Sequence, residues 1–293
     1  MSKLHVVQQG QGPALVLSHA LGCDLQMWDG VAQALEDRFT VVRYDHRGHG
    51  RSPAIGEAFD MNDLADDAAG VIEALGQGPV HFVGLSMGGM TAQALAVRHP
   101  ALVRSITIAN SASYYDEAAR AGWQARIATV HDQGVAVIAD GAMQRWFTPE
   151  FRTGQAARVA TLRAGLEALA AKPYAAACAA VGGIDFRESN RRIACPALLI
   201  AGSRDEATPP ALSEDMQAQI PGAQLVSLPA AHLSAVEMPV EFAQLVSDFV
   251  AQIRALGVGL DLGVFYRRRL AVDLREQIDE ALLMDVAELI CRP

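Results

Sequence analysis

The chain has 293 residues, 51% of them hydrophobic, and a formal net charge of −9. This length and apolar content suffice for one large domain with a buried core, or at most two domains. The acidic balance argues against nucleic acid and anionic membranes as main partners, because both require a basic surface.

The N-terminus and the cysteines indicate a protein of a reducing compartment. The opening residues, Met1-Ser2-Lys3, start no apolar run long enough for a signal peptide or a membrane span. The cysteines form neither a CxxC pair nor a cluster with histidines at zinc spacing. We therefore expect a cytoplasmic protein with free, buried cysteines, no metal and a small-molecule substrate.

Apolar runs of strand length recur in the first 110 residues and again after residue 196. Continuous runs of this kind are typical of strands buried on both faces of a parallel sheet. The expected strands are 14–18, 39–44, 80–85, 105–109, 197–201 and 224–228. Helical patterns alternate with them at 61–75, 87–99, 209–220 and 239–255. This alternation predicts an α/β fold with a mostly parallel, doubly wound sheet.

Two segments depart from the alternation. Residues 114–186 are rich in alanine and helix formers and contain no convincing strand, which predicts a helical cap over one end of the sheet. The α/β core would then comprise residues 1–113 and 187–255. Residues 256–293 form a tail whose amphipathic pattern predicts a helix. That helix would either pack on its own domain or serve dimerisation, so a homo-oligomer stays open.

The motif Gly84-Leu85-Ser86-Met87-Gly88 fits G-x-S-x-G, between an expected strand and an expected helix. In a nucleophile elbow the serine occupies a strained turn, and a side chain at either glycine would collide with the packed strand and helix. The turn raises the hydroxyl above the C-terminal edge of the sheet, at a helix N-terminus that favours developing negative charge. We predict an α/β-hydrolase fold with Ser86 as nucleophile.

A serine hydroxyl needs an adjacent base, and this fold places serine, acid and histidine in that order along the chain. His232, in the loop after the last expected strand, meets this requirement. Asp205, in the loop after strand 197–201, is the expected acid that orients the histidine ring. Glu206 and Asp185 are the alternatives for the acid.

The turn Ser18-His19-Ala20-Leu21-Gly22, after the first expected strand, is of the HGxG kind. The backbone N–H groups of Leu21 and Met87 are predicted to stabilise an oxyanion, at about 3 kcal/mol each. His19 would hold this loop, and direct substrate contact is the alternative role for it. The charged turn at 44–52 is expected to brace the sheet edge through buried ion pairs and hydrogen bonds.

Together these motifs resemble the 3-oxoadipate enol-lactonases, over about residues 12–250. The more selective pieces are DLQMW at 24–28, RWFT at 145–148, and His232-Leu233-Ser234 followed by Glu237. The chain departs from the family at 19–22, where the family more often has Asn-Ser-Leu-Gly. It also offers only residues 4–9 for the usual N-terminal hairpin, and its tail after about 255 has no counterpart.

The resemblance implies that the chain opens 3-oxoadipate enol-lactone to 3-oxoadipate through an acyl-enzyme, as in the β-ketoadipate pathway of aromatic catabolism. It implies no cofactor. Because this lactone carries an acetate group, Arg145 is the candidate to pair with the carboxylate. Trp146 is the candidate to line the pocket.

Other functions would use the same triad. A carboxylesterase or a cofactor-free perhydrolase of the haloperoxidase type would differ only in the ester that it accepts. A carbon–carbon bond hydrolase is a further alternative, and so is a ligand receptor that keeps its triad but signals through a partner. A haloalkane dehalogenase is excluded, because its nucleophile would be a carboxylate where Ser86 stands.

Overall fold

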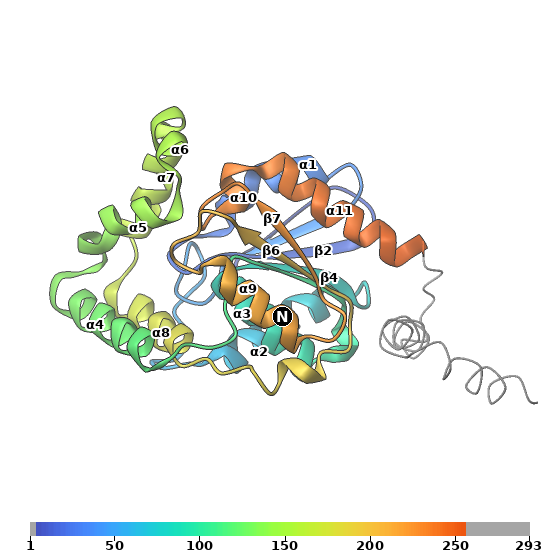
Figure 1. Cartoon of the computed structure of the whole chain (residues 1–293), viewed down its shortest axis with the longest axis horizontal. Helices are drawn as coiled ribbons and strands as arrows, with labels where there is room; N and C mark the ends of the chain where they lie inside the picture. Colours follow the sequence, from blue (N-terminus) through green and yellow to red (C-terminus); the bar gives the residue numbers. More distant parts are fainter. Residues whose placement is uncertain (1–3, 256–293) are drawn as a thin grey trace, which may run out of the picture. The chain divides into compact units, whose positions relative to one another are not determined.

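The computed structural model describes residues 4–255 of the chain, and those up to Gln252 belong to one compact unit. Its centre is a seven-stranded sheet with the strand order β1-β3-β2-β4-β5-β6-β7 (Figure 1). β1 runs antiparallel to β3, and the other neighbouring strands are parallel. The strands are β1 (Val6–Gln9), β2 (Ala14–Ser18), β3 (Thr40–Tyr44), β4 (Val80–Leu85), β5 (Val103–Ala109), β6 (Ala197–Gly202) and β7 (Gln224–Leu228).

Helices cover both faces of the sheet, with α1 and α11 on one face and α2, α3 and α9 on the other (Figure 1). Their bounds are α1 (Asp29–Leu35), α2 (Met61–Leu75), α3 (Met87–Arg98), α9 (Pro210–Gln219) and α11 (Pro239–Ala255). Strands β2, β3, β4 and β6 are buried along their whole length, as their continuous apolar sequences require. The predicted α/β-hydrolase architecture is confirmed, and each strand expected from an apolar run forms within two residues of its predicted ends.

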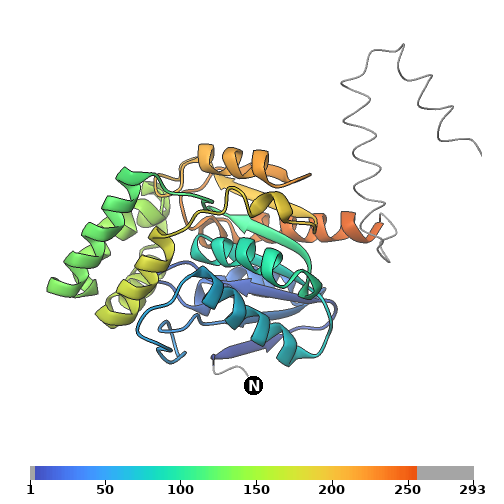
Figure 2. The same ribbon diagram turned by 90° about the horizontal axis from the view of Figure 1, so that it is seen from below.

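Five α-helices lie between β5 and β6, in the stretch for which the sequence predicts a cap. They are α4 (Glu117–Gln133), α5 (Ala139–Trp146), α6 (Pro149–Gly154), α7 (Ala156–Glu167) and α8 (Ala171–Gly182). Both ribbon views show them gathered at one end of the sheet (Figures 1 and 2). We call these five helices and their connections the cap. The tail helix predicted within 256–293 lies outside the described residues.

The described part of the chain contains no helix that combines the length and the apolar character needed to span a lipid bilayer.

The turn from β4 into α3 is closely packed. Ser86 adopts φ 56°, in the region that favours glycine. A side-chain carbon at Gly84 would lie 2.0 Å from the Gly88 carbonyl oxygen, and one at Gly88 would lie 2.0 Å from the carbonyl oxygen of Ser18 in β2. The two glycines therefore allow α3 to begin directly against β2, with Ser86 at the top of the turn.

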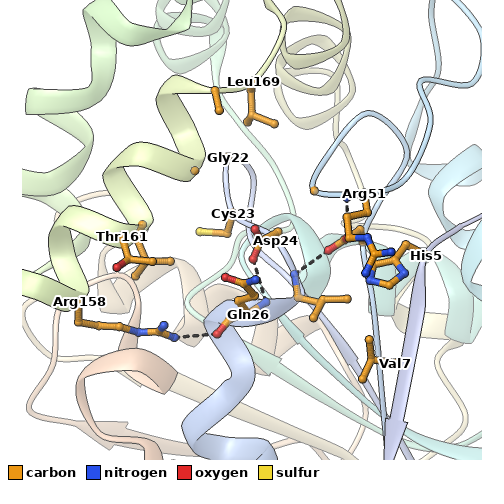
Figure 3. A pocket seen from close by; sticks show the side chains of 16 residues that line it. His5, Val7, Gly22, Cys23, Asp24, Gln26, Arg51, Arg158, Thr161 and Leu169 are labelled. Atoms are coloured by element: carbon orange, nitrogen blue, oxygen red, sulfur yellow. Dashed lines mark hydrogen bonds between the residues drawn. The ribbon is translucent and has the colours of Figure 1, made fainter.

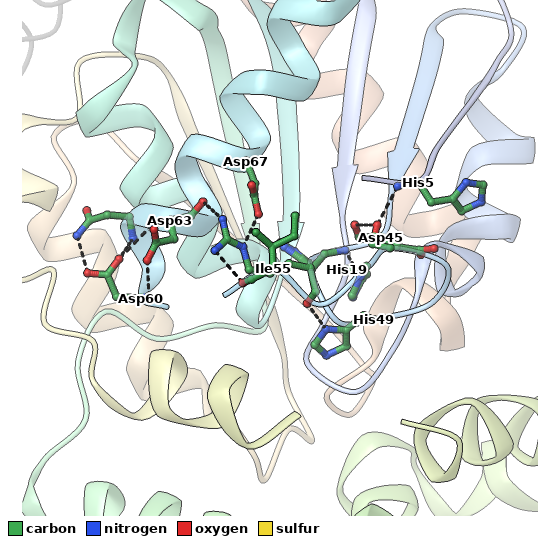
Figure 4. A network of polar contacts seen from close by, with 12 residues as sticks. His5, His19, Asp45, His49, Ile55, Asp60, Asp63 and Asp67 are labelled. Atoms are coloured by element: carbon green, nitrogen blue, oxygen red, sulfur yellow. Dashed lines mark hydrogen bonds and ion pairs between the residues drawn. The ribbon is translucent and has the colours of Figure 1, made fainter. Parts of the chain in front are cut away.

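Three buried histidines, His19, His46 and His49, support the loop that follows β2. The ring centroids of His46 and His49 lie 4.6 and 5.3 Å from that of His19. His19 and His49 each donate from Nδ1 to a backbone carbonyl. At Nε2, His19 accepts the N–H of His46 (2.9 Å) and His49 accepts the N–H of Gly22 (3.3 Å). Figure 4 shows His19 and His49 near the charged turn that follows β3. Both rings must be neutral, because a protonated ring nitrogen cannot accept a hydrogen bond.

The turn at residues 44–52 braces the sheet edge as expected. The carboxylate of Asp45 accepts the N–H groups of Leu25 and Arg51, both at 2.8 Å. The guanidinium of Arg47 donates to Asp67 on α2 at 2.6 Å (Figure 4). This turn therefore ties the start of η1 (Leu25–Trp28) and helix α2 to the end of β3.

The histidines predict how stability depends on pH. Burial lowers the pKa of His19 to about 4. Burial, and the repulsion that a protonated His19 would exert, lower the pKa of His49 to about 3. In the unfolded chain both groups titrate near pH 6.5. Between pH 6.5 and about 4 the unfolded chain therefore binds more protons, and the free energy of unfolding should fall as the pH falls. The slope should approach about 1.4 kcal/mol per pH unit for each of these two histidines.

Urea unfolding between pH 4.5 and 7.5 measures this slope. The exposed His131 provides the control, since His131→Gln should show the same slope as the wild type. A free energy of unfolding that stays constant from pH 6.5 to 4.5 would contradict the account of neutral, buried rings.

Candidate active site

Three polar side chains meet at one edge of the sheet. Ser86 directly follows β4, Asp205 follows β6 and His232 follows β7. Because these strands are parallel, their C-terminal ends lie at the same edge. The Nδ1 atom of His232 lies 2.9 Å from Oδ2 of Asp205, and His232 and Ser86 line the same pocket. The structure therefore brings the three predicted triad residues together.

The carboxylate of Asp205 is buried and fully hydrogen bonded. Its Oδ2 also accepts the Thr208 hydroxyl at 2.7 Å and the Asn110 amide at 3.0 Å. Its Oδ1 accepts the N–H groups of Ala207 and Thr208. Burial alone raises the pKa of Asp205, but the charge of His232 and the hydrogen bonds from His232, Thr208 and Asn110 outweigh it and lower the pKa to about 2. Asp205 is thus held as a carboxylate against the histidine ring.

The two alternative acids occupy other positions. Glu206 lines the pocket but is exposed. Asp185 forms a surface ion pair with Arg187, at 2.8 Å. Of these three carboxylates, the geometry brings Asp205 to the ring of His232.

Within residues 4–255 no hydrogen bond links the Ser86 hydroxyl to His232. The Nδ1 atom of the ring is engaged by Asp205 and lies 3.2 Å from the Thr208 hydroxyl. The Nε2 atom is therefore the ring nitrogen left to receive a proton from the serine. Such catalytic bonds are often long before a substrate binds and tighten in the complex.

Asn110 is a site residue that the sequence reasoning missed. It lies at the end of β5 and has φ 45°, a conformation that asparagine tolerates better than most residues. Its amide nitrogen donates to Asp205 and to the Ala231 carbonyl (3.1 Å), and its amide oxygen accepts the Ser234 hydroxyl. Asn110 thus forms hydrogen bonds to the acid and to residues on both sides of His232 in the chain. Its place at the end of a parallel strand was the available sequence signal.

Two backbone donors lie beside Ser86. Met87 is the first residue of α3, where an N–H has no partner inside the helix. In the loop after β2, the N–H groups of Ala20, Gly22 and Cys23 donate to protein acceptors. The N–H of Leu21 forms no hydrogen bond to another described residue, and Leu21 lines the pocket with Ser86. Neither of the two N–H groups predicted for an oxyanion is therefore used by another described residue.

The pocket above Ser86 has a volume of about 310 Å³. This is near the lower end of the range of about 300–1,000 Å³ for small-molecule sites, so it suits a small substrate. The cap supplies one wall, formed by Tyr115, Ala119, Gly122, Trp123, Arg126, Arg145 and Trp146. The structure thus places both Arg145 and Trp146 at the pocket.

Two arginines stand in this wall, Arg145 from α5 and Arg126 from α4. Sequence reasoning missed Arg126, because a single arginine on a helix carries no pattern. Neither arginine forms a salt bridge within the described part of the chain, and Arg126 lies over the Trp123 ring at 5.0 Å. Burial and the nearby charge of Arg126 both lower the pKa of Arg145. An anionic group in the pocket would relieve this repulsion.

His19 does not line the pocket. Its side chain is fully buried, and its two ring nitrogens bond to the Ala20 carbonyl and the His46 N–H. His19 therefore supports the loop from beneath, and its side chain is not accessible to a substrate.

A second cavity, of about 420 Å³, is also lined by the loop after β2 (Figure 3). Gly22, Cys23, Asp24 and Gln26 line it from the core, and Arg158 from α7 donates to the Gln26 carbonyl at 2.7 Å. Burial raises the pKa of the Cys23 thiol well above its usual value, so Cys23 stays protonated. The loop thus contributes to both cavities, and Ser86 and His232 line only the first.

Comparison with known proteins agrees with this geometry. Residues 13–239 match the family model for the α/β-hydrolase fold. The chain is 38% identical to 3-oxoadipate enol-lactonase 1 of Acinetobacter baylyi, over 83% of this chain and 90% of that protein. A second enol-lactonase of the same organism is 36% identical, over 80% and 87%.

Among solved structures, the enol-lactonase of Burkholderia xenovorans superposes with a TM-score of 0.81 at 34% identity. The match covers 85% of this chain and 96% of that one. The resemblance to enol-lactonases that the motifs indicated is confirmed. The chain is a hydrolase and belongs to the α/β-hydrolase fold family.

Proposed function

We propose that the chain opens 3-oxoadipate enol-lactone to 3-oxoadipate, with Ser86 as nucleophile, His232 as base and Asp205 as the acid that orients the base. The observation that carries this proposal is the Asp205–His232 pair, whose histidine shares a small pocket with Ser86. The wall of that pocket bears two arginines that form no salt bridge within residues 4–255. The names of the two Acinetobacter relatives support the choice of lactone.

The acylation step follows from the positions of these groups. His232 Nε2 removes the proton of the Ser86 hydroxyl as its oxygen attacks the lactone carbonyl. The N–H groups of Leu21 and Met87 donate to the oxyanion that forms. Asp205 keeps the proton on Nδ1 and stabilises the imidazolium. The bond from the carbonyl carbon to the ring oxygen then breaks.

The released oxygen takes the proton from His232 and becomes an enol, still attached to the acyl chain. The enol tautomerises to the ketone. A water molecule, deprotonated by His232, attacks the ester that joins the acyl group to Ser86. Collapse of the second tetrahedral intermediate returns the proton to the serine oxygen and releases 3-oxoadipate.

The substrate carboxylate fits the arginine-bearing wall. A guanidinium binds a carboxylate through two parallel N–H donors, and the bond is stronger where water is excluded. Arg145 is the primary partner in this proposal, and Arg126 adds a second positive charge. Their attraction would offset the overall negative charge of the protein, which otherwise repels an anion.

A direct assay of the wild-type chain with the enol-lactone tests the substrate. We expect kcat/KM for the lactone to exceed that for p-nitrophenyl acetate, because the neutral ester lacks the carboxylate. A chain that hydrolyses the neutral ester but leaves the lactone intact would contradict the lactonase proposal and favour a carboxylesterase.

The acid is tested by a pair of neighbouring substitutions. Asp205→Asn should lower kcat by about 10⁴-fold, because the amide no longer stabilises the imidazolium. Glu206→Gln is the matched control and should change kcat by less than about threefold, because an exposed carboxylate has little electrostatic effect on the histidine. Steady-state kinetics on p-nitrophenyl acetate measures both. The larger loss in Glu206→Gln would show that the acid has been assigned to the wrong residue.

The anion site is tested by Arg145→Ala and Arg126→Ala. We expect Arg145→Ala to raise KM for the enol-lactone by about 10–100-fold, the value of one or two charge-assisted hydrogen bonds. The effect of Arg126→Ala should be smaller but of the same sign. Arg152→Ala, on α6 and outside the pocket, is the control. Equal increases of KM for the lactone and for p-nitrophenyl acetate would rule out a role in binding the carboxylate.

A further inference from the structure

The C-terminal end of helix α5 is attached to the loop that carries His232. The carbonyl oxygen of Trp146, the last residue of α5, accepts the N–H of Leu233 at 3.0 Å. Carbonyls in the last turn of a helix have no partner inside the helix, so this one is free to bind the core. Leu233 directly follows His232. The first bond between cap and core therefore lies one residue from the proposed base.

A second attachment lies two residues further along the cap. The carboxylate of Glu237, at the end of α10 (Ser234–Glu237), accepts the N–H of Thr148 at 2.7 Å and its hydroxyl at 3.2 Å. The Thr148 hydroxyl also caps α6 by accepting the N–H of Phe151. Burial raises the pKa of Glu237, and N–H groups of Thr148 and Ala231 oppose this increase. Glu237 thus contacts the cap and the residue that precedes His232.

The cap residues next to these two attachments form part of the pocket wall. Arg145 and Trp146 line it. The Trp146 ring also lies against Gly22, since a side-chain carbon on that glycine would be 3.3 Å from the ring. Trp146 therefore touches the loop after β2 through its ring and the His232 loop through its backbone. A shift of this segment would move the pocket wall relative to Ser86.

Two ion pairs between the cap and the core are exposed. Arg204 pairs with Glu150 of α6 at 2.9 Å, with side chains 46% and 71% exposed. Lys172 pairs with Glu57 at 2.6 Å on open surface. Exposed ion pairs of this kind contribute little to the stability of a fold. The half-buried Glu237 carboxylate is the better candidate to fix the cap.

We propose that Glu237 is a positioning residue, which seats the Arg145–Trp146 wall on the His232 loop and so sets the affinity for substrates whose remote carboxylate reaches the cap. This inference rests on the proposed function for the triad and for the anion site. Glu237 touches no reacting atom. Its loss should weaken binding of the remote group and spare the chemical step at Ser86.

Two activated esters test the proposal. p-Nitrophenyl acetate needs only the triad, whereas the p-nitrophenyl monoester of succinic acid also presents a carboxylate to the cap. Glu237→Ala should raise KM for the succinyl ester by about 10-fold or more, as misplaced binding groups do, and change its kcat less than threefold. Both constants for the acetyl ester should change less than threefold.

Matched variants separate position from charge and from general stability. Glu237→Gln keeps an oxygen to accept the Thr148 N–H and should retain KM within about threefold. Glu237→Asp keeps the charge but shortens the side chain, so it should resemble Glu237→Ala, and it replaces that variant if the alanine protein fails to fold. Glu150→Ala, at the exposed pair, should match the wild type on both esters.

Amide hydrogen exchange gives an independent readout. Glu237→Ala or Glu237→Asp should speed exchange at residues 144–150 and 229–234 together, without a general increase elsewhere in residues 4–252. Equal losses on both esters, or no change on either, would overturn the positioning role. If the wild type hydrolyses the acetyl ester but KM for the succinyl ester is no lower, the anion site fails first and this inference fails with it. If the wild type hydrolyses neither ester, the triad proposal itself is wrong.

Discussion

The carboxylate of Asp205 is the group on which the site depends. A buried charge must be compensated by hydrogen bonds or by an opposite charge. Without such compensation the folded state loses on the order of several kcal/mol of stability. Here the compensation comes from separate strand ends: Asn110 after β5, Thr208 within the β6 loop and His232 after β7. Satisfying the charge therefore requires these loops to converge. The same convergence places the histidine ring at the pocket that Ser86 lines, so the contacts that satisfy the buried charge also align the proposed catalytic pair.

The buried histidines that support the loop after β2 are held by hydrogen bonds and carry no charge. His19 and His49 are neutral, and each accepts a backbone N–H at a ring nitrogen that protonation would block. Neutral rings can be buried without a counter-ion, so the loop is held without a charge near the predicted oxyanion position. The charges of the pocket are instead placed on the cap, on Arg126 and Arg145. In the proposed function, this separation lets the core carry the chemistry while the cap selects the substrate.

Sequence reasoning predicted the parts that depend on local pattern. The strands follow from continuous apolar runs, and the turn at Ser86 follows from two glycines whose side-chain positions are filled by backbone. It missed Asn110, Arg126 and the contact between Glu237 and Thr148. These roles arise from segments up to 124 residues apart in the chain, as between Asn110 and Ser234, and no local pattern marks such contacts. The position of His19 was foreseen only as one of two alternatives.

The measurement that tests the account most directly is mass spectrometry of the chain quenched during turnover of p-nitrophenyl acetate. The account predicts one added acetyl group on the peptide that contains Ser86, and more of it in Asp205→Asn if deacylation slows more than acylation. It also predicts that Ser86→Ala carries no acetyl group there and loses activity by about 10⁴- to 10⁶-fold while remaining folded. An acetyl group on another residue, or normal turnover by Ser86→Ala, would contradict the serine mechanism.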